Sequence, residues 1–313
     1  MPAQEVMICG MPRSEYAAQI RRMLKPLPKL NVEHIRRKWR DIPYTNREPF
    51  RKLDIYLPEK GHGPFPAVIY IHGGGFVSGG KDDVSSAVAL NGLDRGYAVV
   101  IIDYTLSLDA SFPLQIHEVK AAIRWVKANG ARYSIDVSRI ALMGASAGAH
   151  LAALAGTSGA VGELEDKSLG HPDMDCAVQA VVVDFTPVNF ATVNEQLIRL
   201  GRSIPEGLMA PQHTVALYLG DVMENVPDIV KKTNPETYIS SKSPPFFIQH
   251  GKEHQILPYL QSVHFAERLA EAVGKDKVEL SLLEGVGGGD DPNYFTPETI
   301  GREYDFLDRF LSV

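Results

Sequence analysis

One short segment of the sequence has the residue types and spacing of a nucleophile. Ser146 lies at the centre of GASAG at 144–148, between an apolar run at 140–143 and an alanine-rich run at 150–155. A serine on a tight strand-to-helix turn is exposed at the edge of a sheet, and small residues two positions away on either side prevent a collision. The following helix adds a positive dipole and free N–H groups. The pattern predicts a nucleophilic serine; an inert serine in a glycine-rich turn is the alternative.

A second glycine-rich segment, HGGGF at 72–76, closes another apolar run. Because glycine has no Cβ, the backbone N–H groups of consecutive glycines can point at the carbonyl oxygen of a substrate. We expect the N–H groups of Gly73, Gly74 and Ala147 to form an oxyanion hole, where one donor is typically worth about 3 kcal/mol of transition-state stabilisation. His72 is expected to brace this loop rather than to act as a catalyst.

These two segments, together with Asp103-Tyr104, resemble the α/β-hydrolase superfamily, in its hormone-sensitive-lipase-like and bacterial feruloyl/acetyl-esterase branch. The resemblance extends from about residue 50 to the C-terminus. It implies an α/β-hydrolase fold and a carboxylesterase-type hydrolase that acts on small acyl or aryl esters through an acyl-serine. It also implies that no metal and no cofactor take part.

The chain departs from this family at two positions. A serine nucleophile needs a base, usually a histidine that is oriented by a carboxylate. The resemblance places the acid at 254, within HGKEHQILP at 250–258, and the base at 288, but the sequence has His254 and Gly288 there. Because the last histidine of the chain is His264, no histidine follows the final apolar run. The usual triad is therefore absent.

We interpret the two changes as coupled. The imidazole of His254 would fill the space that Gly288 leaves and act as a relocated base for Ser146. In a normal triad the imidazole of the histidine lies between the acid and the serine. A histidine at the acid's position therefore needs a loop adjustment or a bridging water to reach Ser146. Candidate auxiliary carboxylates are Glu253, Asp290 and Asp291. Natural loss and deliberate engineering would both produce this sequence.

Each of these interpretations has an alternative. His254 can be a neutral pocket histidine without a catalytic role, and Gly288 an ordinary turn glycine with positive φ. A non-hydrolytic protein would use the same pocket to bind a ligand. A third class of protein would use His254 as a base or nucleophile for different chemistry.

The elements around these residues predict an α/β fold with a mostly parallel sheet and helices on both faces. Short continuous apolar runs are typical of parallel strands that are covered on both sides. They occur at 67–71, 98–102, 140–143, 180–183, 246–248 and 278–283. Helical patterns separate them, including 113–129 with Gly130 as a stop, 259–273, and a last helix that begins with Thr296 and Pro297.

Two segments do not follow the alternation. Residues 1–48 are predicted as an N-terminal helical or cap segment, with a helix near 15–24, before a hydrolase domain at 49–313. Residues 188–243 are predicted as an insertion over the carboxyl ends of the strands, where open α/β sheets bind ligands. This insertion is expected to be a lid or a pocket wall.

The composition excludes several classes of partner. The chain has 313 residues and a net charge of −6, so nucleic acid and anionic membranes are poor partners. Cys9 and Cys176 do not form a disulfide framework, and no histidine spacing is typical of a metal site. Without a signal peptide or a span of roughly 20 apolar residues, we expect a soluble cytoplasmic protein. Its expected partner is a small-molecule ester; a homodimer is left open.

Overall fold

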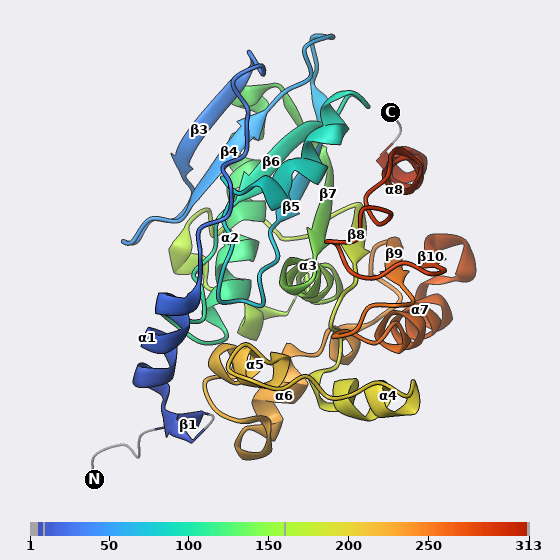
Figure 1. The fold of residues 1–313 in the computed structure, drawn as a ribbon. Helices are drawn as coiled ribbons and strands as arrows, with labels where there is room; N and C mark the ends of the chain where they lie inside the picture. The colour runs from blue at the N-terminus through green and yellow to red at the C-terminus, as the bar shows by residue number, and fades with distance from the viewer. Residues whose placement is uncertain (1–5, 9, 160, 312–313) are drawn as a thin grey trace.

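A computed structural model of the chain describes residues 6–8, 10–159 and 161–311. Its centre is an eight-stranded sheet in the order β10-β9-β8-β7-β5-β6-β4-β3 (Figure 1). The strands from β5 to β10 pair in parallel, whereas β4 is antiparallel to β6, and β3 is antiparallel to β4. The strands are β3 (Lys38–Pro43), β4 (Lys52–Tyr56), β5 (Phe65–Ile71), β6 (Ala98–Ile102), β7 (Ile135–Ala145), β8 (Ala180–Asp184), β9 (Phe246–Gly251) and β10 (Val278–Leu283).

The predicted mostly parallel sheet is confirmed. Each of the six apolar runs lies within one of the parallel strands, and the runs at 98–102 and 278–283 coincide with β6 and β10. Strand β7 is longer than its run, because it begins at Ile135 and includes the partly exposed Asp136 and Arg139 before the buried run. Residues 135–139 alternate apolar and polar side chains and form no continuous apolar run, so only the part of β7 from Ile140 was predicted.

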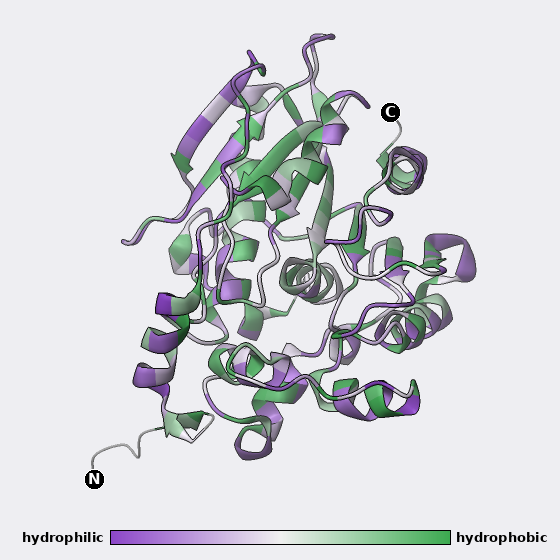
Figure 2. Cartoon of the chain, viewed as in Figure 1, coloured by the Kyte–Doolittle hydropathy of each residue, from purple (hydrophilic) through white to green (hydrophobic). Residues whose placement is uncertain are grey.

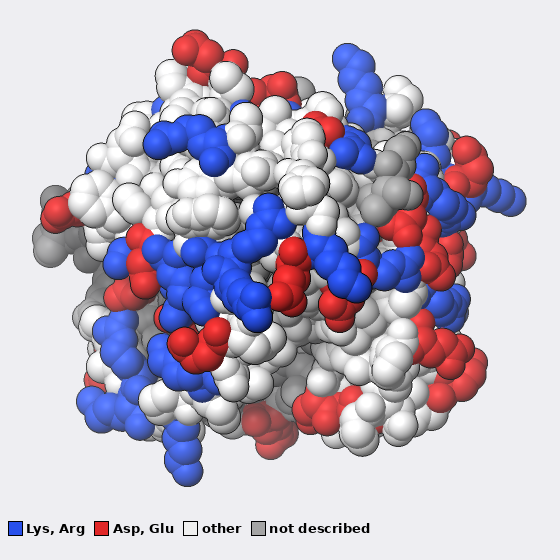
Figure 3. Space-filling view, turned by 90° about the horizontal axis from the view of Figure 1, so that it is seen from above, with Lys and Arg blue, Asp and Glu red and all other residues white. Residues whose placement is uncertain are grey.

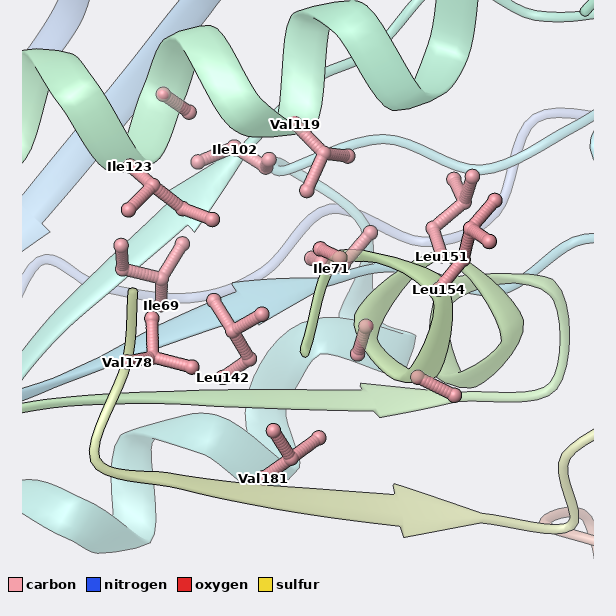
Figure 4. Close-up of a cluster of buried hydrophobic side chains, with 14 of the residues drawn as sticks. Ile69, Ile71, Ile102, Val119, Ile123, Leu142, Leu151, Leu154, Val178 and Val181 are labelled. Carbon is pink, nitrogen blue, oxygen red and sulfur yellow. The ribbon is translucent and has the colours of Figure 1, made fainter. Parts of the chain in front are cut away.

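Helices cover both faces of the sheet. On one face lie α2 (Leu114–Asn129), α3 (Ala147–Thr157) and α7 (Leu260–Val273); on the other lie α8 (Pro297–Leu311) and the 3-10 helix η1 (Val84–Leu93). Alternate residues of β5 divide between the faces, so that Ile69 packs with α2 and α3, and Val68 with α8. The first of these two cores is shown in Figure 4, and the central strands are the most hydrophobic part of Figure 2.

Two helix ends were predicted from single residues. Pro297 begins α8, and the Thr296 hydroxyl accepts a hydrogen bond from the Thr299 N–H at 3.2 Å, as an N-cap does. Helix α2 ends at Asn129 as predicted, but Gly130 stays right-handed and starts the 3-10 turn η2 (Gly130–Tyr133). Ser134 takes the left-handed conformation instead, with φ 57°.

The predicted N-terminal segment contains two different structures. Helix α1 (Arg13–Met23), preceded by the short ladder of β1 (Met7–Ile8) and β2 (Met11–Pro12), packs on helix α5 (Pro211–Leu219). The Arg13 guanidinium donates to the Leu217 carbonyl at 3.5 Å, which ties the two helices together. Strand β3 instead extends the main sheet, so a boundary at residue 48 separates it from its partner β4.

The segment at 188–243 is mostly helical, as expected. It contains α4 (Val193–Arg199), α5 and α6 (Pro227–Thr233), which lie together below the carboxyl end of the sheet in Figure 1. Within the described residues, every helix is too short or too polar to cross a membrane. On the face seen in Figure 3, acidic and basic side chains lie close together. Cys9 lies outside the described residues, and Cys176 is a buried free thiol.

Candidate active site

Ser146 occupies the turn between β7 and α3. Its backbone has φ 55° and ψ −121°, which few residues other than glycine adopt. The Ser146 N–H donates to the Asp184 carbonyl of β8 at 2.9 Å, and the Ser146 carbonyl accepts from the His150 N–H at 3.0 Å. These two bonds hold the strained turn and leave the side chain partly exposed at the carboxyl end of the sheet.

Two glycines make this turn sterically feasible. A Cβ on Gly144 would lie 2.6 Å from the carbonyl carbon of Gly148. A Cβ on Gly148 would lie only 2.0 Å from the carbonyl oxygen of Ile71, at the end of β5. Neither distance is compatible with a side chain, so the spacing of the two glycines is dictated by backbone that crosses close to the serine.

The predicted oxyanion residues border the same space as Ser146. Gly74 has φ +110°, and a Cβ there would lie 2.1 Å from the Ser78 carbonyl oxygen. Gly73, Gly74 and Ser146 line one cavity, and Gly74, Ser146 and Ala147 line another. Since Ala147 is the first residue of α3, the helix supplies no acceptor for its N–H.

His72 braces the glycine loop, as predicted. Its ring stacks on Tyr104 with the ring centroids 4.4 Å apart, and its Nδ1 lies 2.8 Å from the Gly73 carbonyl oxygen. Burial lowers the pKa of His72, so the ring is neutral near pH 7. A neutral donor at this position fixes the Gly73 peptide without adding a charge beside the serine.

Ser146 lies between two cavities. The insertion cavity, of about 270 Å³, has an apolar wall from the 188–243 segment. That wall comprises Phe190, Val193, Met209, Pro211, Val215 and Met223. The α8 cavity, of about 810 Å³, has a wall from the opposite side of the molecule. That wall comprises Leu27, Val84, Val88, Phe295, Pro297 and Ile300.

His254 lines both cavities together with Ser146. Its Nδ1 accepts hydrogen bonds from the Ile256 and Leu257 N–H groups, each at 3.2 Å. A neutral imidazole carries one proton, so an accepting Nδ1 leaves the proton on Nε2. Burial lowers the pKa of His254 to about 4, and the ring is therefore neutral near pH 7. In this tautomer, Nε2 is a hydrogen-bond donor.

The ring of His254 lies against Gly288. A Cβ on Gly288 would be 2.9 Å from Nε2 of His254 and 3.2 Å from Oδ1 of Asp290. The imidazole therefore lies where a side chain at 288 would begin. Gly288 is not among the glycines with positive φ, so the alternative of a turn glycine that needs positive φ is wrong. No backbone conformation requires glycine at this position.

The structure does not join the two predicted catalytic residues by a hydrogen bond. Among the described residues, the Ser146 hydroxyl makes no hydrogen bond to His254. The ring of His254 is instead held by its bonds to the loop backbone and by Phe185, whose ring centroid is 5.5 Å away.

The three auxiliary carboxylates have different surroundings. Glu253 is exposed and lies 3.7 Å from the Arg202 guanidinium, which also donates to the His254 carbonyl. Asp291 accepts from the Gly287 and Asn293 N–H groups and so shapes its own loop. Asp290 lines the α8 cavity with Ser146.

A buried carboxyl pair beneath the serine was missed by sequence reasoning. Asp184 and Glu303 are 1% and 0% exposed, and the Gln249 amide donates to both, at 3.3 and 3.1 Å. Burial raises the pKa of Asp184 to about 7 and that of Glu303 well above its ordinary value. The available signal was an aspartate at the end of the apolar run at 180–183. Its partner comes from α8, which no local pattern reveals.

The other buried histidines have structural partners. The His150 ring donates from Nδ1 to the Pro187 carbonyl at 2.7 Å, and the His250 ring donates from Nε2 to the Leu257 carbonyl at 3.0 Å. Burial lowers their pKa values to about 4 and about 3. Within the described ranges, no three His, Cys, Asp or Glu residues are grouped so that they could hold a metal ion.

The sheet order, the strained serine turn and the glycine loop define an α/β-hydrolase fold. A family model described as BD-FAE matches residues 53–269, and the chain belongs to this family. The chain is 32% identical to Esterase LipQ of Mycobacterium tuberculosis (strain ATCC 25618 / H37Rv) over 239 residues, covering 74% of this chain and 52% of LipQ.

One more curated relative and one solved structure are also esterases by their descriptions. Esterase LipC of the same organism is 29% identical over 248 residues, covering 78% of this chain and 58% of LipC. A solved structure described as a truncated form of a carbohydrate esterase from gut microbiota has a TM-score of 0.80 and 28% identity. It covers 91% of this chain and 100% of its own. The chain thus spans little more than half the length of the curated relatives.

Proposed function

We propose that this chain hydrolyses small carboxylic esters through an acyl intermediate on Ser146. The observation that carries this function is the serine turn and the oxyanion glycines, which open together onto two cavities. A nucleophile, a site for the developing oxyanion and room on both sides of an ester bond are the parts that acyl transfer needs. The names of the relatives LipC and LipQ support the same class of reaction.

In the proposed reaction, the Ser146 oxygen attacks the ester carbonyl carbon. The carbonyl oxygen becomes an oxyanion that accepts hydrogen bonds from the N–H groups of Gly73, Gly74 and Ala147. The alcohol leaves with a proton, and water then releases the acid from the serine. The insertion cavity is small and apolar, which suits a short acyl or aryl group.

His254 is the proposed base. Its resting tautomer means that accepting the serine proton costs free energy. To take the Ser146 proton on Nε2, the ring must carry its own proton on Nδ1. That exchange breaks the bonds from the Ile256 and Leu257 N–H groups, each worth about 1 kcal/mol. The lowered pKa of His254 further weakens it as a base near pH 7. We therefore expect slow turnover.

A fluorophosphonate probe and p-nitrophenyl acetate test the function. We expect covalent labelling of the wild-type serine and a burst of p-nitrophenol that equals the enzyme concentration. The Ser146→Ala variant should lose both. Slower labelling of His254→Gln would support the proposed base. Labelling of the wild type that does not exceed labelling of Ser146→Ala would exclude the esterase function.

A second function, ligand binding without turnover, is favoured by one observation. The loop holds the proton on Nε2 of His254, so the resting site offers a donor where the serine needs an acceptor. Such a protein would retain an ester in the cavities and release it unchanged. Saturable binding of an ester, with no hydrolysis over a broad pH range, would identify this function.

A further inference from the structure

Among the described residues that line the α8 cavity, one side chain is a carboxylate, that of Asp290. The ionisable lining residues of this cavity are Tyr70, His254 and Asp290. Burial raises the pKa of Tyr70 and lowers that of His254 to about 4, so both are neutral at pH 7. No lysine or arginine belongs to this lining. Asp290 is therefore the residue of this lining that can attract a positively charged group.

This carboxylate acts electrostatically on His254, whose pKa it raises against the larger lowering by burial. Among the described residues, no hydrogen bond or ion pair engages the Asp290 side chain, which is exposed at the edge of the cavity. Arg202 acts on the same loop, but it donates to the carbonyls of Lys252 and His254 and lies 3.7 Å from Glu253. Asp290 is thus free to pair with a positive group that enters from solvent.

Two aromatic rings lie against the backbone of Gly289, the residue before this aspartate. A Cβ on Gly289 would lie 2.8 Å from the Phe185 ring and 3.2 Å from the Phe295 ring. The two ring centroids are 6.3 Å apart, and both residues line the α8 cavity. The absence of a side chain at Gly289 lets both rings approach the backbone beside Asp290.

A carboxylate, aromatic rings and apolar walls together are suited to an organic cation. The faces of aromatic rings attract alkylammonium groups, and apolar walls can contact the methyl groups of such cations. A hydrated metal ion has no methyl groups and would not gain the second contact. We propose that the α8 cavity binds the cationic end of an amino-alcohol or trialkylammonium ester, with Asp290 as the specificity-determining residue. The ester part rests on the proposed hydrolytic function; binding of the cation itself does not.

Two esters of nearly equal shape test the specificity. Acetylcholine and 3,3-dimethylbutyl acetate differ chiefly in a quaternary nitrogen that replaces a carbon. We expect kcat/KM to favour the cationic ester by about threefold, as a partly solvent-exposed cation contact allows. The preference should vanish in Asp290→Asn and reverse in Asp290→Lys. Glu284→Gln removes one charge from the same loop, where Glu284 pairs with Lys252 at 2.7 Å, and should keep the preference.

A binding measurement separates this inference from the proposed reaction. Tetramethylammonium is titrated into the Ser146→Ala variant, with and without Asp290→Asn, and followed by NMR. Binding that Asp290→Asn weakens about threefold supports the cation site, even if no ester is hydrolysed. Absence of binding, or equal binding with and without Asp290→Asn, would overturn it. Equal kcat/KM for the two esters, unchanged by Asp290→Asn, would overturn it as well.

Discussion

The site has two halves, the serine turn with its glycine loop and the pair of loops at 250–258 and 284–291, and different features of the sequence determine their geometry. Around Ser146, the geometry comes from backbone, because glycines at 144, 148 and 74 each avoid a collision with a main-chain atom. On the loops at 250–258 and 284–291, function depends on which side chains stand at two positions. The first half contains the two glycine-rich motifs, and the second half has His254 and Gly288 at the positions where the family resemblance predicts an acid and a base. We therefore expect loss of a glycine in the first half to destabilise the fold, and a change at position 254 or 288 to affect catalysis more than stability.

The largest expected effect comes from restoring the second half. His254→Asp with Gly288→His should raise kcat for a small ester by about 10²–10⁴-fold, because a histidine at 288 could accept the serine proton and a carboxylate could orient it. Initial rates with p-nitrophenyl acetate measure the gain. His254→Asp alone supplies no base and is the control. Equal rates in the two variants would mean that the pocket, too, has diverged.

Substitution of a glycine in the first half should lower the stability of the fold instead. Gly148→Ala places a Cβ 2.0 Å from the Ile71 carbonyl oxygen, and we expect a loss of about 3 kcal/mol or more in the free energy of unfolding. Urea denaturation followed by circular dichroism measures it. Gly162→Ala is the matched control, because a Cβ there meets nothing within 4 Å. A Gly148→Ala variant as stable as this control would contradict the steric account.

The buried carboxyl pair should make the free energy of unfolding depend on pH. The folded-state pKa of Asp184, about 7, lies above the unfolded value of about 4, so the folded state retains a proton that the unfolded state loses. Stability from this proton is complete below pH 4 and falls by up to about 1.4 kcal/mol per pH unit until about pH 7. Asp184→Asn should reduce the slope of this part of the pH profile, and the slope that remains is the contribution of Glu303, whose pKa is also raised. Urea midpoints between pH 4.5 and 7.5 measure the slope, and an unchanged slope would contradict the assignment.

The smallest expected effect on stability comes from a substitution at Gly288. Gly288→Ala puts a Cβ 2.9 Å from Nε2 of His254, so the ring should move toward solvent at a cost of about 1 kcal/mol. The pKa of His254 should then rise from about 4 toward its ordinary value, as an NMR titration would show. Gly287→Ala, with its nearest contact at an ordinary 3.5 Å, should leave the titration unchanged.

Local sequence patterns predicted the parts that local physics determines. The strands at 98–102 and 278–283, the cap at Thr296 and the turn at Ser146 depend on neighbouring residues, and each was predicted correctly. The family resemblance predicted that positions 254 and 288 belong to the site, but it could not give the tautomer of His254. That tautomer depends on where two backbone N–H groups of its own loop point in space.

Longer-range features had no comparable signal. The edge strand β3 depends on pairing with β4, and its bulge between Trp39 and Ile42 interrupts the alternation that a pattern needs. The meeting of Asp184 with Glu303 requires α8 to pack beneath β8. The left-handed residue after α2 is Ser134 rather than Gly130, because the 3-10 turn postpones the reversal of the chain.

The walls of the α8 cavity also affect how the chain folds. Leu27 comes from the N-terminal region and Ile300 from α8, so this cavity joins opposite ends of the chain. Contacts of such large sequence separation carry the greatest loop-closure cost, and the cavity is complete only when both ends have docked. A ligand held there binds the native state and not its precursors. By mass action it stabilises the whole fold, including the distant N-terminal helix.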